Sequence, residues 1–517
     1  MTAFSPCRTA SLDHRSDMSA LFDKPIQLAL KQKVVSGIYW RFGERLGSQI
    51  TMFFIGIALA RLLGPAPFGT IALLAIFMNL AGILVDCGFG KALVQKETLT
   101  ETDCSTAFAT NVAFGLVSYV VLWIAAPWIA VFYNRPDLSS ILRLVALGLF
   151  VSALDCVPQS LIVRRMDFRL SFRIELVQNI VYGITSIALA LSGAGLWTLV
   201  FAPLAGRLSG TAVRWATCGW WPARSFSKRA FHRLFSYGWK LSCASAVGAV
   251  SNDLAGVLIG RFYTPVQLAF YGKGNSFPNG VATAINATVS SVSFSALSKL
   301  QNDQDRIRKA ARELLRVLSF LLLPCMGLLA GTAPSLTHCL LGPQWKPIVP
   351  FVQLGCFAVS FSPFSIVNIQ TLAAIGRSDL TLKLEIAKKG FSILVMLLTL
   401  PHGVMAFAIA AAFLSTPVSA LVNIIPNRKV IRYGIRSQLR DAAPAILVAL
   451  LVFSATSAVG QIAGVLSFPV LLLQSSCGVA AFFLFAATVK PTGWKTTIEL
   501  FRYRFLKQKG KNGFETA

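Results

Sequence analysis

Charged residues that recur at the starts of two apolar segments could bind a phosphate group. Arg41, Glu44 and Arg45 stand at positions i, i+3 and i+4, so one helical face carries two arginines and one glutamate. Lys240 follows a tryptophan in a second segment, as Arg41 does in the first. Because a planar guanidinium group pairs with phosphate oxygens, this spacing predicts an anion site. The alternative for Arg41, Arg45 and Lys240 is that they only reach toward water from a helix end.

Two further ionisable residues lie inside apolar segments. Asp253 follows Asn252 in the segment that Lys240 begins, and Arg207 lies within another segment. If such a segment crosses a membrane, each charge costs about 2.5 to 3.5 kcal/mol unless it faces a partner or a wet cavity. We therefore expect Arg207 and Lys240 to line a cationic cavity together with Arg41 and the nearby Arg45.

A second group of charged residues stands near helix ends or glycine-rich turns. Its members are Glu44, Arg61, Asp86, Lys91, Arg261 and Lys273. For Arg61 and Arg261, capping of the last helical carbonyls competes with a role in binding. Asp86 and Lys91 flank a glycine-rich helix end, where a structural cap or a mutual ion pair is the simpler interpretation.

Motifs for catalysis and metal binding do not accompany these residues. The 10 cysteines form no CxxC pair, and the 4 histidines are dispersed. The chain contains no phosphate-binding GxxxxGK[ST] loop, GxSxG elbow or HExxH motif. We therefore expect a protein that is not an enzyme and that holds no metal or bound cofactor.

The composition indicates a membrane protein. Of 517 residues, 55% are apolar, and the mean hydropathy is +0.64, which is more apolar surface than a soluble fold could bury. Apolar runs long enough to span a bilayer, about 20 residues each, recur between short charged connectors. The predicted class is all-α: a polytopic membrane protein of about 14 transmembrane helices, with two pseudo-symmetric six-helix bundles and two C-terminal helices.

The apolar runs and their polar breaks predict the domain organisation. The segments are a cytoplasmic N-terminal tail (1–34), a first six-helix bundle (35–217), a cytoplasmic linker (218–235), a second six-helix bundle (236–425), a connector with two extra helices (426–489) and a basic cytoplasmic tail (490–517). The two bundles share a pattern. Arg61 to Pro65 and Arg261 to Pro265 both read Arg-x-x-x-Pro, about 200 residues apart, after the first helix of each bundle.

The basic residues indicate which loops face the cytoplasm. Lysine and arginine outnumber aspartate and glutamate by 48 to 21, a net charge of +27, and they collect in alternate loops such as 164–169, 224–233 and 428–440. This pattern is typical of positive-inside orientation and places both termini in the cytoplasm. A nucleic-acid-binding protein would instead carry this charge on one face, interleaved with aromatic residues.

Several short strings, in order, resemble the polysaccharide exporters of the multidrug/oligosaccharidyl-lipid/polysaccharide flippase superfamily, particularly the colanic-acid and exopolysaccharide exporter branch. They are Ala60–Pro65, Asp86–Gln95, Leu99–Glu101, Val157–Gln159, Arg164–Arg169, Asn252–Asp253, Leu258–Arg261, Leu340–Trp345 and Ala374–Asp379. Each string alone is weak, but their succession from about 35 to 380 is specific.

The resemblance implies a flippase of the bacterial inner membrane. Such a protein translocates undecaprenyl-diphosphate-linked oligosaccharide repeat units from the cytoplasmic to the periplasmic leaflet by alternating access, for exopolysaccharide or lipopolysaccharide biosynthesis. A diphosphate cannot cross hydrocarbon unaided, whereas a basic, wet cavity can hold it. The resemblance also implies a coupling cation, sodium or proton, for which Asp253 is the candidate site, and the polysaccharide polymerase machinery as a partner.

Three other functions compete with this one. A multidrug exporter of the same superfamily should carry acidic residues in its cavity, which the excess of arginine and lysine opposes. A lipid-II-type flippase has similar charge requirements and is poorly separated by sequence. A membrane-embedded polymerase or ligase acts on the same lipid but generally carries a long periplasmic loop, and here the longest external connectors are little more than a dozen residues.

Overall fold

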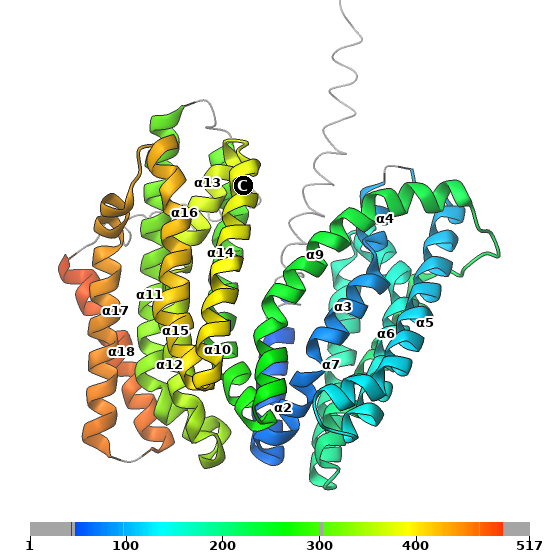
Figure 1. The fold of residues 1–517 in the computed structure, drawn as a ribbon, viewed down its shortest axis with the longest axis horizontal. Helices are drawn as coiled ribbons and strands as arrows, with labels where there is room; N and C mark the ends of the chain where they lie inside the picture. Colours follow the sequence, from blue (N-terminus) through cyan, green and yellow to red (C-terminus); the bar gives the residue numbers. More distant parts are fainter. Residues whose placement is uncertain (1–42, 44–46, 97, 299–302, 465, 490–517) are drawn as a thin grey trace, which may run out of the picture. The chain divides into compact units, whose positions relative to one another are not determined.

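The computed structural model describes residues 43, 47–96, 98–298, 303–464 and 466–489 (Figure 1). The regular structure of these residues is helical, which confirms the predicted all-α class. Within them, 11 helices are long and apolar enough to cross a membrane, or up to 12 if one bent pair is a single span. Large apolar side chains such as Trp128 and Val131 are 68% and 73% exposed, as a lipid-facing surface requires.

The described helices up to Ser298 are joined by short connectors. They are Gly47–Leu63, α2 (Pro65–Leu73), α3 (Ala75–Asp86), α4 (Phe89–Gln95), α5 (Glu101–Phe132), α6 (Asp137–Arg164), α7 (Phe168–Leu191), α8 (Thr198–Cys218), α9 (Lys228–Phe262) and α10 (Pro265–Ser298). α9 begins inside the predicted linker, so the second part of that linker is helical. The Ser227 hydroxyl caps its start by accepting a 3.4 Å hydrogen bond from the Ala230 amide.

Eight further α-helices follow α10 among the described residues. They are α11 (Gln304–Leu341), α12 (Val349–Val359), α13 (Ser362–Ala374), α14 (Ser378–Thr399), α15 (Val404–Ala410), α16 (Thr416–Val430), α17 (Ile435–Ala463) and α18 (Phe468–Val489). A π-helical turn, Ala411–Ser415, joins α15 to α16. Helices α10 and α14 are not among the described candidate spans. The count of 14 membrane crossings therefore remains a prediction.

The chain forms two compact units. The first comprises the described residues within Met1–Gly56, Met78–Ala130 and Pro136–Val247. The second comprises those within Ile57–Phe77, Val131–Arg135 and Gly248–Ala517. Helices α3, α5 and α9 each contribute residues to both units.

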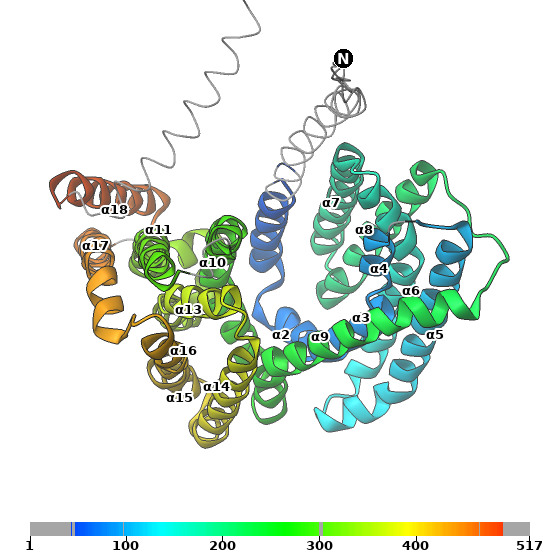
Figure 2. The same ribbon diagram turned by 90° about the horizontal axis from the view of Figure 1, so that it is seen from above.

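In the first unit, α8 packs along both α6 and α7, and α4 packs on α6 (Figure 2). The start of α4 lies tightly against α9. Gly88, at φ 69°, would place a Cβ 2.7 Å from the Cα of Gly238. Since no larger residue fits this approach, the glycine-rich turn before α4 fixes the position of the charged residues on either side of it.

In the second unit, α11 runs beside α17, and α17 runs beside α18 (Figure 1). The apolar core between them includes Trp345, which is fully buried. Its ring packs edge-on against Phe68 at 5.8 Å and Phe270 at 6.0 Å, measured between ring centroids. One buried indole therefore packs against aromatic residues of both α2 and α10.

The repeated Arg-x-x-x-Pro pattern marks the same kind of junction twice. Pro65 begins α2 and Pro265 begins α10, each directly after a long helix has ended. At the first junction the backbone turns by 113° at Gly64, whose φ of 73° suits glycine. Helices α2 and α10 then pack so closely that a Cβ on Gly69 would lie 1.7 Å from the Pro265 carbonyl oxygen.

Three prolines inside helices have their lost hydrogen bonds replaced. A proline lacks the N–H that would bond the carbonyl four residues earlier. The carbonyls left free by Pro127, Pro158 and Pro334 accept bonds from side chains of neighbouring helices instead. The pairs are Arg143 Nε to Trp123 O at 3.4 Å, Trp215 Nε1 to Leu154 O at 3.2 Å, and Gln353 Nε2 to Ala330 O at 3.3 Å. Each replacement bond also ties two helices together.

Candidate functional site

A cavity of about 780 Å³, lined by both apolar and polar residues, opens in the first unit between α3, α4 and α6. Asp86 at the end of α3 and Lys91 on α4 both line it. These are the two residues expected to form a cap or a mutual pair, and the structure brings them to one cavity. The Asp86 carboxylate lies 4.0 Å from the Cys156 thiol of α6.

One face of α6 supplies much of the opposite wall. Its lining residues are Ser152, Asp155, Cys156, Gln159, Ser160 and Val163. Their spacing is that of a single helical stripe. Asp155 was not predicted as a site residue from the sequence, although a carboxylate in the middle of an apolar segment is the same signal that pointed to Asp253.

Asp155 is held in place by an arginine of α8. One carboxylate oxygen of Asp155 pairs with Arg214, which is 5% exposed. The other oxygen, Oδ1, is buried and has no hydrogen-bond partner among the described residues. Asp155 is therefore fixed by one oxygen while the other retains unused capacity to accept a hydrogen bond.

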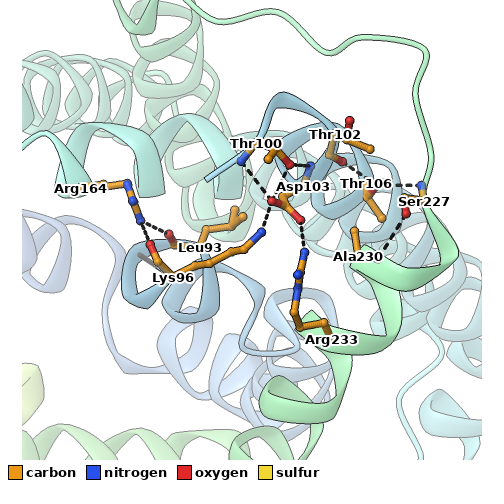
Figure 3. Close-up of polar contacts among 10 residues, drawn as sticks. All are labelled: Leu93, Lys96, Thr100, Thr102, Asp103, Thr106, Arg164, Ser227, Ala230 and Arg233. Carbon is orange, nitrogen blue, oxygen red and sulfur yellow. Dashed lines mark hydrogen bonds and ion pairs between the residues drawn. The ribbon is translucent and has the colours of Figure 1, made fainter. Parts of the chain in front are cut away.

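A second polar cluster, at the start of α5, is centred on Asp103 (Figure 3). The Asp103 side chain is 1% exposed and pairs with Lys96 and, at 2.8 Å, with Arg233 of α9. It also accepts bonds from the Thr100 hydroxyl at 2.6 Å and the Thr100 amide at 3.1 Å. One buried carboxylate thus joins α5, α9 and the loop that follows α4.

Two arginines at the C-terminal end of α6 donate hydrogen bonds to the ends of other helices. Arg164 donates to the carbonyls of Leu93, at 3.0 Å, and Lys96, near the C-terminus of α4 (Figure 3). Arg165 donates to the Cys218 carbonyl at the end of α8, at 2.9 Å. Part of the positive charge predicted to face the cytoplasm therefore caps helices.

A third cluster lies in the second unit around Asp441 of α17. Its carboxylate accepts bonds from Arg312 at 2.8 Å, from Arg316 at 3.0 Å and from the Tyr433 hydroxyl at 2.9 Å. Tyr433 lies between two apolar helices, and burial, reinforced by the Asp441 carboxylate, raises its pKa. This cluster fixes α11 against α17 and was not predicted from the sequence.

Several of the predicted cavity residues are beyond what the structure shows. Arg41, Glu44 and Arg45 lie outside the described residues, and so does the side chain of Lys240. Arg207 is exposed on α8, with its Nη1 3.5 Å from the Gly148 carbonyl oxygen of α6. The cationic cavity therefore stays a prediction.

Asp253, the candidate for a coupling cation, is half-buried on α9 in the second unit. The neighbouring Asn252 side chain accepts a 3.2 Å hydrogen bond from Lys389 of α14. Among the described residues, no group of three or more histidines, cysteines, aspartates or glutamates could hold a metal ion. A sodium or proton site at Asp253 also stays a prediction.

Arg61 bonds the end of another helix and not its own. It donates to the Leu340 carbonyl at 2.8 Å and to the Cys339 carbonyl, both in the last turn of α11. In return, the side chains of Gln344 and Trp345 donate to the Ala60 carbonyl at 3.2 and 2.9 Å. Two of the strings that carry the family resemblance thus interlock.

The remaining two predicted residues contact aromatic rings of the second unit. The Arg261 guanidinium lies 5.3 Å from the ring centroid of Phe132. The Lys273 ammonium lies 5.7 Å from the ring centroid of Phe68. Both are cation–π contacts between two helices.

The fold is all-helical, with 11 or 12 described helices long and apolar enough to span a membrane. It matches the solved structure described as lipid II flippase MurJ in an inward closed conformation, with a TM-score of 0.69 and 12% sequence identity. The match covers 87% of this chain and 98% of MurJ. At this identity the likeness shows a shared fold.

Residues 58–350, more than half of the chain, match the family described as Polysaccharide biosynthesis protein, and the chain belongs to that family. This confirms the family resemblance found in the sequence. Teichuronic acid biosynthesis protein TuaB of Bacillus subtilis is 26% identical over 58% of this chain and 62% of its own length. Lipopolysaccharide biosynthesis protein WzxC of Escherichia coli is 22% identical over 70% of this chain and 74% of its own. The chain thus spans less than two thirds of TuaB.

Proposed function

We propose that this protein is a flippase of the bacterial inner membrane. It moves undecaprenyl-diphosphate-linked oligosaccharide repeat units from the cytoplasmic to the periplasmic leaflet by alternating access, for exopolysaccharide or lipopolysaccharide biosynthesis. The observation that carries the proposal is the fold: a chain of the polysaccharide biosynthesis family has the fold of a protein described as a lipid II flippase. It is a transporter and not an enzyme.

The charge of the chain suits such a substrate. A diphosphate that leaves water needs compensating positive charge, and this chain has a net charge of +27. We assign the diphosphate to Arg41, Arg45, Arg207 and Lys240, because the sequence places each of these basic residues within or at the start of an apolar segment. Asp253 is the proposed site of the coupling cation, sodium or proton. Both termini lie in the cytoplasm, and the polymerase machinery receives the product.

The test is complementation of a deletion strain. We expect deletion to abolish surface polysaccharide while full-length lipid-linked repeat units accumulate in the cytoplasmic leaflet, and the wild-type gene to restore export. The double variant Arg41→Ala/Arg45→Ala should fail to restore it at equal expression. The matched control is Arg224→Ala/Arg229→Ala, which removes two exposed arginines of the connector before and at the start of α9 and should restore export.

Two outcomes would reject the proposal. Repeat units that reach the periplasm unpolymerised in the deletion strain would identify a polymerase or ligase. Normal polysaccharide together with a lost resistance to cationic drugs would identify a multidrug exporter. Restoration by the Arg41→Ala/Arg45→Ala variant would reject only the assignment of the diphosphate to these arginines.

A further inference from the structure

The cavity between α3, α4 and α6 offers hydrogen-bonding groups that the protein itself leaves unused. Its volume, about 780 Å³, falls in the range of about 300 to 1,000 Å³ that is typical of small-ligand sites. All of its lining residues belong to the first unit. The cavity is therefore formed within one compact set of helices.

The α6 wall presents a line of polar groups. Ser152, Asp155 and Gln159 stand at i, i+3 and i+7, so all three lie on one face of the helix. Gln159 is exposed and has no hydrogen-bond partner among the described residues. Oδ1 of Asp155 is buried and also has no partner among them. Polar groups are costly in a membrane-spanning helix. Because these two side chains have hydrogen-bonding atoms without a partner in the described part of the chain, they point to a ligand.

The opposite wall carries two charges that do not neutralise each other by contact. Asp86 and Lys91 both line the cavity, yet the described residues show no ion pair between them within 4.0 Å. Gly90 lies between the two. A Cβ at this position would stand 3.1 Å from the Ser160 hydroxyl and 3.5 Å from the Asp86 carboxylate, so the glycine keeps the floor of the cavity open.

This mixture of groups suits a polyol better than an ion. A sugar hydroxyl donates and accepts at once, so a saccharide needs strong acceptors beside strong donors. The carboxylates of Asp86 and Asp155 accept, while the Lys91 ammonium and the Gln159 amide donate. A phosphate would be repelled by the two carboxylates, and a metal cation by Lys91 and by the arginine that pairs with Asp155.

We propose that this cavity binds a sugar residue of the lipid-linked oligosaccharide through hydrogen bonds from its hydroxyl groups to Asp86, Lys91, Asp155 and Gln159. The proposal rests on the flippase function proposed above and adds to it a glycan-recognition site, separate from the arginines assigned to the diphosphate. Such a site would let the protein distinguish a completed repeat unit from the bare lipid carrier.

Two lipid probes test the site on the full-length purified protein. One is the lipid-linked repeat unit extracted from the deletion strain, and the other is undecaprenyl diphosphate without sugar. The measured quantity is the ratio of their dissociation constants, which isolates the contribution of the glycan. We expect the wild-type protein to bind the glycosylated lipid about tenfold more tightly or better, because several hydrogen bonds are added.

The variants Gln159→Ala and Asp86→Asn should each bring this ratio close to one while leaving the affinity for undecaprenyl diphosphate unchanged. Gln159→Ala is the primary variant, because the glutamine is exposed and contributes no hydrogen bond to the described fold. The matched controls are Gln461→Ala near the end of α17 and Asp305→Asn in the first turn of α11, both exposed, and both should keep the wild-type ratio.

Three results would overturn the proposal. An unchanged ratio in both cavity variants would show that the glycan binds elsewhere. A loss of affinity for both lipids would show that the cavity holds the diphosphate. If sodium changes the affinity of the wild-type protein for the lipids, and Asp86→Asn loses this effect but keeps the wild-type ratio, the cavity is a cation site. If the wild-type protein binds neither lipid, the proposed flippase function itself fails, which separates that failure from the other three.

Discussion

The indole Nε1 of Trp215 donates a 3.2 Å hydrogen bond to the carbonyl oxygen of Leu154, which Pro158 leaves without its usual helical partner. The carbonyl belongs to α6 and the indole to α8. The same arrangement recurs at Pro127 and Pro334 with an arginine and a glutamine as donors. A broken helical bond inside one helix is thus converted into a bond between two helices.

A double-mutant cycle at Trp215 and Pro158 tests this relationship. Trp215→Phe keeps an aromatic ring near Phe108 and Trp220 but leaves the Leu154 carbonyl unpaired, so we expect a loss of about 1 kcal/mol of stability. In the Pro158→Ala background the new backbone N–H can bond that carbonyl, and Trp215→Phe should then cost less. The measurement is thermal unfolding in detergent, and equal costs in both backgrounds would contradict the interpretation.

Asp103 should be among the most sensitive polar residues of the first unit. Asp103→Asn removes the charge that compensates Lys96 and Arg233, and breaking one side of a buried pair typically costs about 3 to 5 kcal/mol. Since Arg233 is largely exposed, the lower end of that range is expected. The matched control is Asp305→Asn, whose surface pair with Arg308 should contribute almost nothing. A melting temperature equal to that of the control would count against a structural role for Asp103.

Tyr433 should make stability depend on pH at the alkaline end. The pKa of its hydroxyl is raised in the folded state above the ordinary value of 10.0, because of burial and then Asp441. Its contribution is therefore fully present below about pH 10 and is lost as the pH rises through the folded-state pKa. Tyr433→Phe should be less stable than wild type at pH 8, and the difference should shrink above pH 10. Parallel unfolding curves across this range would contradict the prediction.

Arg61 offers a test that separates folding from transport. Because it bonds two carbonyls at the end of α11, Arg61→Ala should lower stability by about 1 kcal/mol. Transport per folded molecule should remain near wild type. The control is Arg224→Ala, an exposed arginine, which should change neither quantity. Wild-type stability with lost transport would instead place Arg61 in the binding of substrate.

The helices were predictable because each apolar run must satisfy its own backbone hydrogen bonds within the bilayer, which leaves a sequence signal about 20 residues long. The junctions at Pro65 and Pro265 were predictable because proline is favoured in the first turn of a helix and is costly in its interior. The helical start of α9 was missed, since the basic composition of residues 228–235 resembles that of a loop.

The polar clusters were harder to predict. Asp103 and Arg233 are far apart in the sequence, and nothing in either segment alone indicates that they pair. The same is true of Asp441 with Arg312. Asp86 and Lys91 were recognised because both lie beside one glycine-rich turn, whereas Asp155 and Gln159 needed the packing of α6 against α4 to become part of the same cavity.

The proline pairs have a consequence for how the chain is made. In each pair the donor side chain comes later in the sequence than the proline that frees the carbonyl. The ribosome therefore synthesises the helix with the unpaired carbonyl before the helix that carries the donor. Since synthesis proceeds at about 5 to 20 residues per second, α6 is complete some seconds before Trp215 of α8 is available. During that interval the Leu154 carbonyl needs water or the protein-conducting channel as a temporary partner. Chains truncated between α6 and α8 would keep this polar defect, which membrane quality control could recognise.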